Sequence, residues 1–300
     1  HAILATDGPG KLTAAFSFGP YGGFHGHFDK LSFVLFGFGE ELAVDPGRSA
    51  SQAYRLPIHR EWYKATTGHN AVLVDGNSQN EADGEYLAFK STSSHAAVTA
   101  SAGPAFEQVS HIRFMMLSPD YLVVIDELSP KDGREHQYDW LYHNKGNTVT
   151  STLPREEIAL GDSPAGYAYL EDIRSFKSRN GEPLVVNFQG EEVRVHMKMA
   201  GEPGDELFLA TGPLRSVEDR VPMAIVRRKG KTVRFATVLE PVAATGAPKV
   251  KDIRLIEGPE FKVIVDTEGG EDYITFTEGK LDRFKISKHT AAGSKTLLEN

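Results

Sequence analysis

Short apolar runs bounded by glycine, proline, aspartate or asparagine recur along the whole chain. They are rich in valine, isoleucine, phenylalanine and threonine, the residue types that favour β-strands. Strands are predicted at residues 12–18, 31–38, 121–125, 193–199, 222–226, 233–239, 261–265, 273–276 and 283–286. No segment sustains the i, i+3, i+4, i+7 apolar spacing of an amphipathic helix. The best helical candidate is the short stretch 53–63, which Pro57 interrupts.

Many strands with few helices are typical of an all-β protein, so we expect a large antiparallel β-sandwich, or super-sandwich. The stretch 241–248 contains Ala-Ala-Thr-Gly-Ala-Pro, a composition that favours a turn or a domain boundary. The sequence therefore predicts a main sandwich domain at residues 1–242 and a smaller C-terminal β-sheet region at residues 243–300.

Composition limits the class of function. Of 300 residues, 40% are hydrophobic and 25% are charged, which is the balance of a globular chain. The absence of cysteine excludes thiol catalysis, thiolate metal sites and disulfides. The apolar runs are strand-sized, so no membrane span is expected. The N-terminus lacks the flank and apolar core of a signal peptide, so either export is absent or its signal was removed.

The net charge of −8 disfavours nucleic-acid binding, and no run of lysine and arginine marks a surface that could follow a phosphate backbone. The same charge bears on any acidic substrate. A polyanion could bind only where a local basic surface overcomes the overall field.

Two histidines lie on a glycine-rich loop before a predicted strand. His25 and His27 follow Gly19-Pro20-Tyr21-Gly22-Gly23, and in an extended backbone their side chains would point to the same side. Loops at sheet edges are frequent positions for binding and catalytic residues. The alternative is a pair of ordinary surface histidines, which are common on loops.

Two further candidates lie at the ends of neighbouring strands. Asp45 follows Glu41-Leu42-Ala43-Val44, and His69 precedes residues 71–74. Together with His27 they would make a His₂Asp site suited to zinc, since imidazole and carboxylate are the available donors. The alternative is that Asp45 merely caps a turn before Pro46-Gly47.

The segment between Asp45 and His69 is basic and aromatic, with Glu61 as its one acid. It contains Arg48, Tyr54, Arg55, His59, Arg60, Trp62, Tyr63 and Lys64. Cations beside aromatic rings are what recognition of an acidic sugar requires, whereas a solvated charged loop is the simpler alternative. We take Arg48, Arg55, Arg60 and Tyr63 as the candidate substrate-binding residues.

These pieces, taken in order, carry a resemblance to a known family. Gly-Phe-His-Gly-His-Phe-Asp at 23–29, Val-Asp-Pro-Gly at 44–47 and Trp-Tyr-Lys-Ala-Thr-Thr-Gly-His-Asn at 62–70 resemble the heparinase II/III-like polysaccharide lyases, including the oligoalginate lyases. The segments 111–114, 121–126 and 138–143 are also similar to sandwich strands of that family. Beyond about residue 150 only the β-rich pattern is shared.

The resemblance implies a lyase that cleaves a uronic-acid polysaccharide, such as alginate or a heparin-like glycan, by β-elimination. It implies a structural zinc ion bound by His27, Asp45 and His69, and contact between His25 and the reacting uronate. Tyr54 is the closest match to the catalytic tyrosine, with Tyr63 as the alternative. It also implies a periplasmic or secreted location.

One departure from the family is large. Such lyases carry a helical toroid domain ahead of the sandwich, and this chain shows no comparable helices. We therefore expect a fragment whose activity needs an N-terminal helical domain or a companion chain.

Two other classes remain open. One is a noncatalytic carbohydrate-binding sandwich. The other is a zinc-dependent hydrolase, because His-x-His-x-Asp is also found in metallo-β-lactamase-like enzymes; there a histidine follows the aspartate, where this chain has Lys30.

Overall fold

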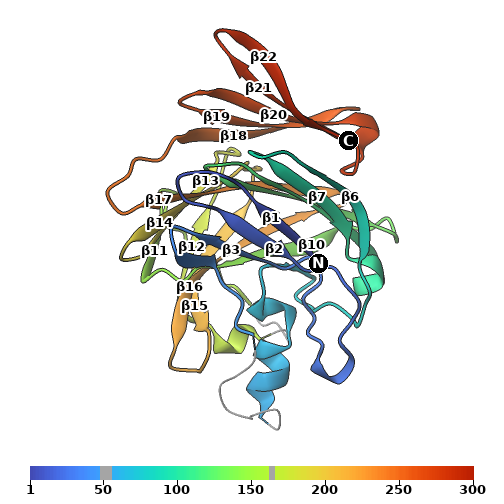
Figure 1. Ribbon diagram of the computed structural model, residues 1–300. Helices are drawn as coiled ribbons and strands as arrows, with labels where there is room; N and C mark the ends of the chain where they lie inside the picture. The colour runs from blue at the N-terminus through green and yellow to red at the C-terminus, as the bar shows by residue number, and fades with distance from the viewer. Residues whose placement is uncertain (48–55, 162–165) are drawn as a thin grey trace.

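Four antiparallel sheets, here called A to D, make up most of the molecule (Figure 1). The structure is a computed structural model of the chain, and it describes residues 1–47, 56–161 and 166–300. Sheet A has the order β1-β2-β3-β4 and consists of β1 (Ala2–Ala5), β2 (Thr13–Phe16), β3 (Phe33–Gly37) and β4 (Glu40–Ala43).

Sheet B has five strands and sheet C has eight. Sheet B runs in the order β12 (Glu171–Lys177), β15 (Glu206–Pro213), β16 (Arg220–Gly230), β10 (His136–His143), β5 (Val72–Val74). Sheet C runs in the order β11 (Thr148–Ser151), β13 (Leu184–Gln189), β14 (Val193–Met199), β17 (Val233–Ala243), β9 (Leu122–Pro130), β8 (Val109–Leu117), β7 (Ala96–Ser101), β6 (Glu85–Ser91).

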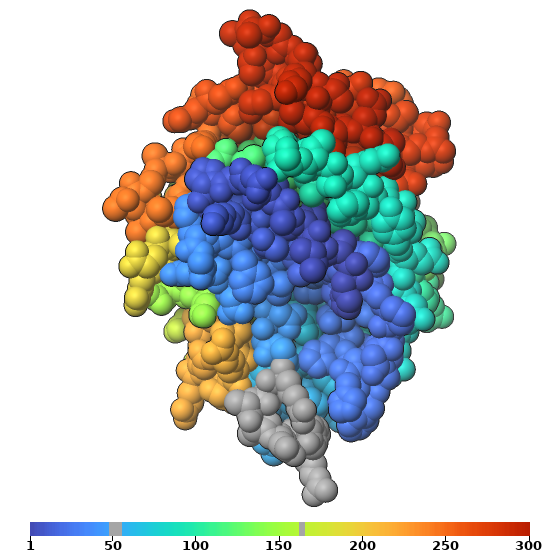
Figure 2. All heavy atoms as spheres, in the orientation of Figure 1, coloured from blue at the N-terminus to red at the C-terminus, as the bar shows by residue number. Residues whose placement is uncertain are grey.

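Sheet D is formed by the last strands of the chain, in sequence order. They are β18 (Val250–Ile256), β19 (Phe261–Thr267), β20 (Gly270–Phe276), β21 (Phe284–Thr290) and β22 (Gly293–Glu299). In Figures 1 and 2 this sheet, in orange and red, lies across one end of the molecule.

Sheet C is the central layer, because both of its faces are buried. In β9, Leu122 and Val124 pack into a core shared with sheets A and B, whereas Val123 and Ile125 pack into a second core shared with sheet D. Side chains alternate between the faces of a strand, so a strand covered on both faces reads as a continuous apolar run. This explains why residues 121–125 carry no polar alternation.

Helical structure in the described ranges is limited to short turns. They are η1 (Gly23–His25), η2 (His59–Tyr63), η3 (Thr66–Gly68), η4 (Gly103–Ala105), η5 (Tyr167–Tyr169) and η6 (Thr277–Gly279). The helix that contains η2 begins at Pro57. Proline is well tolerated at the first position of a helix, so Pro57 starts the helix there, where we had expected an interruption.

The prediction of a large antiparallel β-sandwich with an added C-terminal sheet is confirmed, and the described residues contain no helical toroid. None of their helices is long and apolar enough to cross a membrane. The light-blue segment around η2 and η3 lies at the end of the sandwich remote from sheet D (Figure 1).

Candidate functional site

The loop that carries the two histidines presents one of them to solvent. His25 is exposed at the end of η1, whereas His27 is half-buried two residues later. Gly26 makes the close turn between them possible, since a Cβ atom there would lie 2.5 Å from the ring of Tyr21. That ring stacks on Phe28 with a centroid separation of 6.1 Å, which supports the loop from beneath.

The loop is also fastened to the segment that leads to His69. The amide of Phe28 donates to the carbonyl of Lys64 at 2.9 Å, and the hydroxyl of Thr66 donates to the carbonyl of Phe28 at 2.6 Å. Lys64 Nζ in turn donates to the carbonyl of Phe24 at 3.2 Å. His25 is therefore an exposed side chain on a restrained backbone, with a lysine close by.

His27, Asp45 and His69 come together as the sequence predicted. Asp45 Oδ2 lies 2.6 Å from His69 Nδ1, and the rings of His27 and His69 lie 5.3 Å apart. Asp45 Oδ1 also accepts from the amide of Gly47 at 2.8 Å. Asp45 thus caps the turn with Oδ1 and contacts His69 with Oδ2, so the two interpretations of this residue are compatible.

The pKa values of the two histidines in this cluster are shifted in opposite directions. Burial, together with the neighbouring His69, lowers the pKa of His27 to about 4, so its ring is neutral at pH 7. Burial opposes a charge on His69, but Asp45 outweighs it and raises the pKa of His69. Burial likewise opposes a charge on Asp45, and His69 outweighs it to lower the pKa of that carboxyl.

The donor types of this cluster fit zinc. Zinc–nitrogen bonds of 2.0–2.1 Å in a tetrahedral site put two ligand atoms about 3.3 Å apart, so the 2.6 Å contact of Asp45 and His69 would have to open slightly. His69 Nε2 is buried and has no hydrogen-bond partner. As they stand, no three His, Asp or Glu side chains in the described ranges are arranged to hold a metal ion.

The predicted sugar-binding residues differ in their exposure, and some of them lie outside the described residues. Arg60 is exposed, with 77% of its side chain accessible, and it pairs with Glu61 at 2.8 Å. Tyr63 is 1% exposed and packs in the apolar cluster beneath η2, so packing is the simpler account of this residue, and its contact with sugar stays a prediction. Three predicted residues lie outside the described residues: Arg48, Tyr54 and Arg55.

Phe24 is a surface feature that the sequence analysis did not single out. Its ring is 80% exposed, and it meets the edge of the His25 ring at a centroid distance of 5.3 Å. Large exposed aromatic rings next to polar groups are typical of sites that bind sugars or proteins. One indication of this ring was present in the sequence, a phenylalanine directly before His25.

Asn70, which follows His69, is a second residue that sequence reasoning missed. Its side-chain amide donates to the carbonyls of Phe33 at 2.8 Å and Val44 at 3.0 Å. Its side-chain oxygen accepts from the amide of His143 at 2.7 Å. One buried side chain therefore joins the segments before Asp45 and after His69 to the end of β10.

A buried ionic cluster lies behind this site, in sheet C. Asp126 accepts from Arg113 Nε and Nη2 at 2.7 and 2.9 Å, from His111 Nε2 at 2.6 Å and from Trp140 Nε1 at 2.9 Å. Burial alone would raise the pKa of Asp126, but Arg113 and His111 lower it to about 2. Burial lowers the pKa of His111, which is neutral and donates from Nε2.

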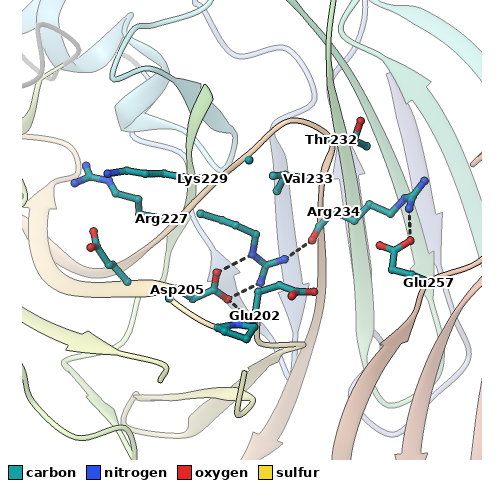
Figure 3. Close-up of a pocket in the computed structure, with 13 residues that line it drawn as sticks. Glu202, Asp205, Arg227, Lys229, Thr232, Val233, Arg234 and Glu257 are labelled. Atoms are coloured by element: carbon teal, nitrogen blue, oxygen red, sulfur yellow. Dashed lines mark hydrogen bonds and ion pairs between the residues drawn. The ribbon is translucent and has the colours of Figure 1, made fainter. Parts of the chain in front are cut away.

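A pocket of about 440 Å³ lies elsewhere, between the β14–β15 and β16–β17 turns. Figure 3 shows Arg234 paired with Glu257 in this pocket, and Asp205 there accepts from Arg228. In the β10–β16 ladder this end holds Gly230 opposite His136, and the site end holds Met223 opposite His143. The pocket therefore belongs to the end of the ladder remote from the histidine loop.

Comparison with known proteins places the region that contains the site in a family. Residues 2–206 match the family described as heparinase II/III-like, C-terminal. An alginate lyase from Stenotrophomonas maltophilia is 28% identical over an alignment of 246 positions, and the match covers 72% of this chain and 33% of that protein. An exo-oligoalginate lyase from Saccharophagus degradans is 28% identical over an alignment of 140 positions, and the match covers 40% of this chain and 19% of that protein.

Solved structures agree at the level of the fold. The heparan sulfate lyase of Pedobacter heparinus superimposes with a TM-score of 0.65 at 15% identity, covering 92% of this chain and 42% of that one. The chain thus spans between a fifth and two fifths of the length of these three relatives. With two thirds of its residues inside the family match, the chain belongs to the heparinase II/III-like C-terminal family.

Proposed function

We propose that this chain is the β-sandwich part of a polysaccharide lyase, which cleaves a uronic-acid polysaccharide by β-elimination and leaves unsaturated uronate ends. The observation that carries the proposal is His25, an exposed imidazole held on a restrained loop beside the His27–Asp45–His69 cluster. The names of the two curated relatives favour alginate, and the heparan sulfate lyase fold keeps heparin-like glycans as the second substrate class.

The proposed elimination explains why hydrogen-bond donors and cations would be needed at this site. The reaction removes the proton at C5 of a uronate and expels the sugar linked at O4, so negative charge develops next to the carboxylate. Donors and cations near that carboxylate lower the barrier, because they stabilise charge that grows in the transition state. We assign this role to His25, with two cations as further candidates: Lys64, which donates to the carbonyl of Phe24, and the exposed Arg60.

The proton itself needs a base, and the proposed one is Tyr54. A tyrosine has an unperturbed pKa of about 10, so it serves at neutral pH only when neighbouring positive charge lowers that value. Arg48 and Arg55 are the proposed sources of that charge and of carboxylate binding. We further propose that an N-terminal helical domain or companion chain completes the groove, and that the protein acts in the periplasm or outside the cell, where such polymers occur.

The test is the ultraviolet absorbance of unsaturated uronate when the full-length protein meets alginate and heparin-like polysaccharides. Appearance of the unsaturated product supports the lyase. Saturable binding with no turnover would favour a noncatalytic carbohydrate-binding sandwich, and cleavage without an unsaturated product would favour a zinc-dependent hydrolase.

Phe24 gives a prediction about substrate binding. Phe24→Ala should raise KM for the oligosaccharide about fivefold, because it removes a stacking contact worth about 1 kcal/mol, and kcat should change by less than twofold. Phe36→Ala is the matched control, since that ring is also exposed, at 41%, but lies on β3. Equal effects of the two substitutions on KM would remove the assignment.

We propose that His27, Asp45 and His69 hold a structural zinc ion. The wild-type protein should retain about one zinc per chain after dialysis, and His69→Ala should retain none. His136→Ala is the control, because His136 also contacts carboxylates, those of Asp75 at 2.6 Å and Asp132 at 3.1 Å.

Removing the metal should lower the melting temperature before it affects the chemistry, since bound metal clamps the segments that supply its ligands. Melting curves and initial rates measured with and without a chelator separate the two effects. Immediate loss of activity at an unchanged melting temperature would show that the metal takes part in the reaction.

A further inference from the structure

We infer that Arg113 is a positioning residue for the site, acting through two backbone carbonyls that border its loops. The kinetic test of this inference rests on the proposed function. A second test, by amide hydrogen exchange, is independent of it. Arg113 lies in β8, in the central sheet, and its side chain is fully buried. Its hydrogen bonds within the described residues go to Asp126 and to backbone carbonyls, and not to the side chains of His25, His27, Asp45 or His69.

The guanidinium of Arg113 binds a carboxylate on one side and two backbone carbonyls on the other. Nε and Nη2 bind Asp126, while Nη1 donates to the carbonyl of Leu31 at 2.5 Å and to that of Asn70 at 2.7 Å. Leu31 ends the loop that carries His25 and His27, and Asn70 follows His69 directly. The same nitrogen therefore sets the separation of the two backbone segments that must face each other in the site.

Leu31 shows that this backbone needs outside support. Its φ of +65° lies in the left-handed region, which is unfavourable for a residue with a branched side chain. Such conformations persist where surrounding contacts hold them. The hydrogen bond from Arg113 to the carbonyl of Leu31 is one of those contacts, and the amide of Leu31 donates to the carbonyl of Ser17 at 2.7 Å.

Asn70 extends the connection to the third segment. Because its side chain donates to the carbonyl of Val44, the residue before Asp45, the loops of His27, Asp45 and His69 all meet at Asn70 and Arg113. Asp126 holds Arg113 in the required orientation, and His111 and Trp140 hold Asp126. The cluster in the sheet thus acts on the site without contacting substrate.

Lysine cannot replace Arg113 in this arrangement. A lysine keeps the charge beside Asp126, but one ammonium group cannot match the planar fork that reaches a carboxylate on one side and two carbonyls on the other. Misplacing reacting groups by about 1 Å can cost on the order of 100-fold in rate. We expect Arg113→Lys in the full-length protein to lower kcat at least tenfold while KM changes by less than threefold.

Arg228→Lys is the matched control. Arg228 is also buried and forms a two-pronged pair with Asp205, at 2.7 and 2.5 Å, and it also donates to backbone carbonyls, those of Ala200 and Arg234 (Figure 3). Asp205 and Arg234 line the remote pocket, and none of these partners belongs to the site. Both substitutions should lower the melting temperature, but only Arg113→Lys should lower kcat when both proteins are assayed fully folded.

Amide hydrogen exchange supplies the readout that does not depend on activity. In Arg113→Lys, exchange should rise at residues 24–31 and 66–71, and in Arg228→Lys it should rise at residues 198–206 instead. Equal falls in kcat for both variants, or no local change at 24–31 and 66–71, would overturn the inference. If wild-type protein shows no lyase activity, the proposed function fails, and the exchange data still decide the role of Arg113.

A second variant covers the case in which Arg113→Lys does not fold. Trp140→Phe removes the hydrogen bond to Asp126, together with part of a buried ring, and leaves Arg113 in place. It should raise exchange in the same two segments to a smaller extent. Unchanged exchange there, in a folded Trp140→Phe protein, would contradict the proposed route through Asp126.

Discussion

His25→Ala in the full-length protein should lower kcat for the elimination by about 100-fold or more, with little change in thermal stability. Removing one group that stabilises developing charge or transfers a proton typically costs 10² to 10⁴ in rate. Stability should hold because His25 is exposed, and substitutions at exposed positions usually change the free energy of unfolding by less than about 0.5 kcal/mol. Steady-state kinetics and melting curves on the same preparation measure both quantities.

His27→Ala provides the comparison. That ring is half-buried beside His69, so its removal should lower stability and zinc retention along with activity. His25→Ala should keep its zinc. A His25→Ala protein with wild-type kcat would exclude His25 from the chemistry and transfer the charge-stabilising role to the cations of the loop.

Asp126→Asn should give the largest loss of stability among the buried groups behind the site, about 3–5 kcal/mol in the free energy of unfolding. The side chain is fully buried and accepts four hydrogen bonds, two of them from Arg113. Neutralising it leaves the arginine as an unpaired buried charge, which is the costly way to break a buried ion pair. Urea unfolding at pH 7 measures the difference.

Glu299→Gln is the surface control, since its partner Lys285 lies 3.1 Å away and both side chains are about half exposed. Its effect should stay within about 0.5 kcal/mol. A loss of similar size in both variants would mean that the buried pair has no special weight.

The contribution of ionised Asp126 to the free energy of unfolding should disappear over a defined range of acidic pH. Its pKa is about 2 in the folded protein and near 3.8 when unfolded, so the folded state favours the charged form. The contribution, about 2 kcal/mol, is complete above pH 4 and is lost as pH falls towards 2. The difference between wild type and Asp126→Asn should therefore shrink over that range and stay constant between pH 5 and 7.

Local patterns predicted the strands and suggested His27, Asp45 and His69 as one set, which the family resemblance strengthened and whose side chains do lie close together. Strand composition and turn residues are properties of neighbouring positions, and family resemblance added the order of the site segments. Tyr63 is a candidate for sugar binding whose burial the local pattern did not predict. It packs with Ile58 and Trp62 in one buried apolar cluster, and its contact with sugar stays a prediction.

Arg113 and Asn70 could not be found in the same way. A buried arginine in an apolar strand is recognisable only through its partners, and those partners are a carboxylate on β9 and carbonyls far back in the chain. Such contacts depend on the packing of sheets and leave no periodic signal in the sequence. The candidate chemistry was therefore predictable from local motifs, but its support was not.

The hydrogen bond from Arg113 to Leu31 spans 82 positions of sequence, and this bears on how the protein is made. During synthesis the histidine loop leaves the ribosome well before the strand that fastens it. The central sheet itself stays incomplete until β17, which pairs with β9, has emerged. The loop that carries the proposed chemistry is thus translated before the strands that fasten it, and it gains its final geometry only after those strands have paired.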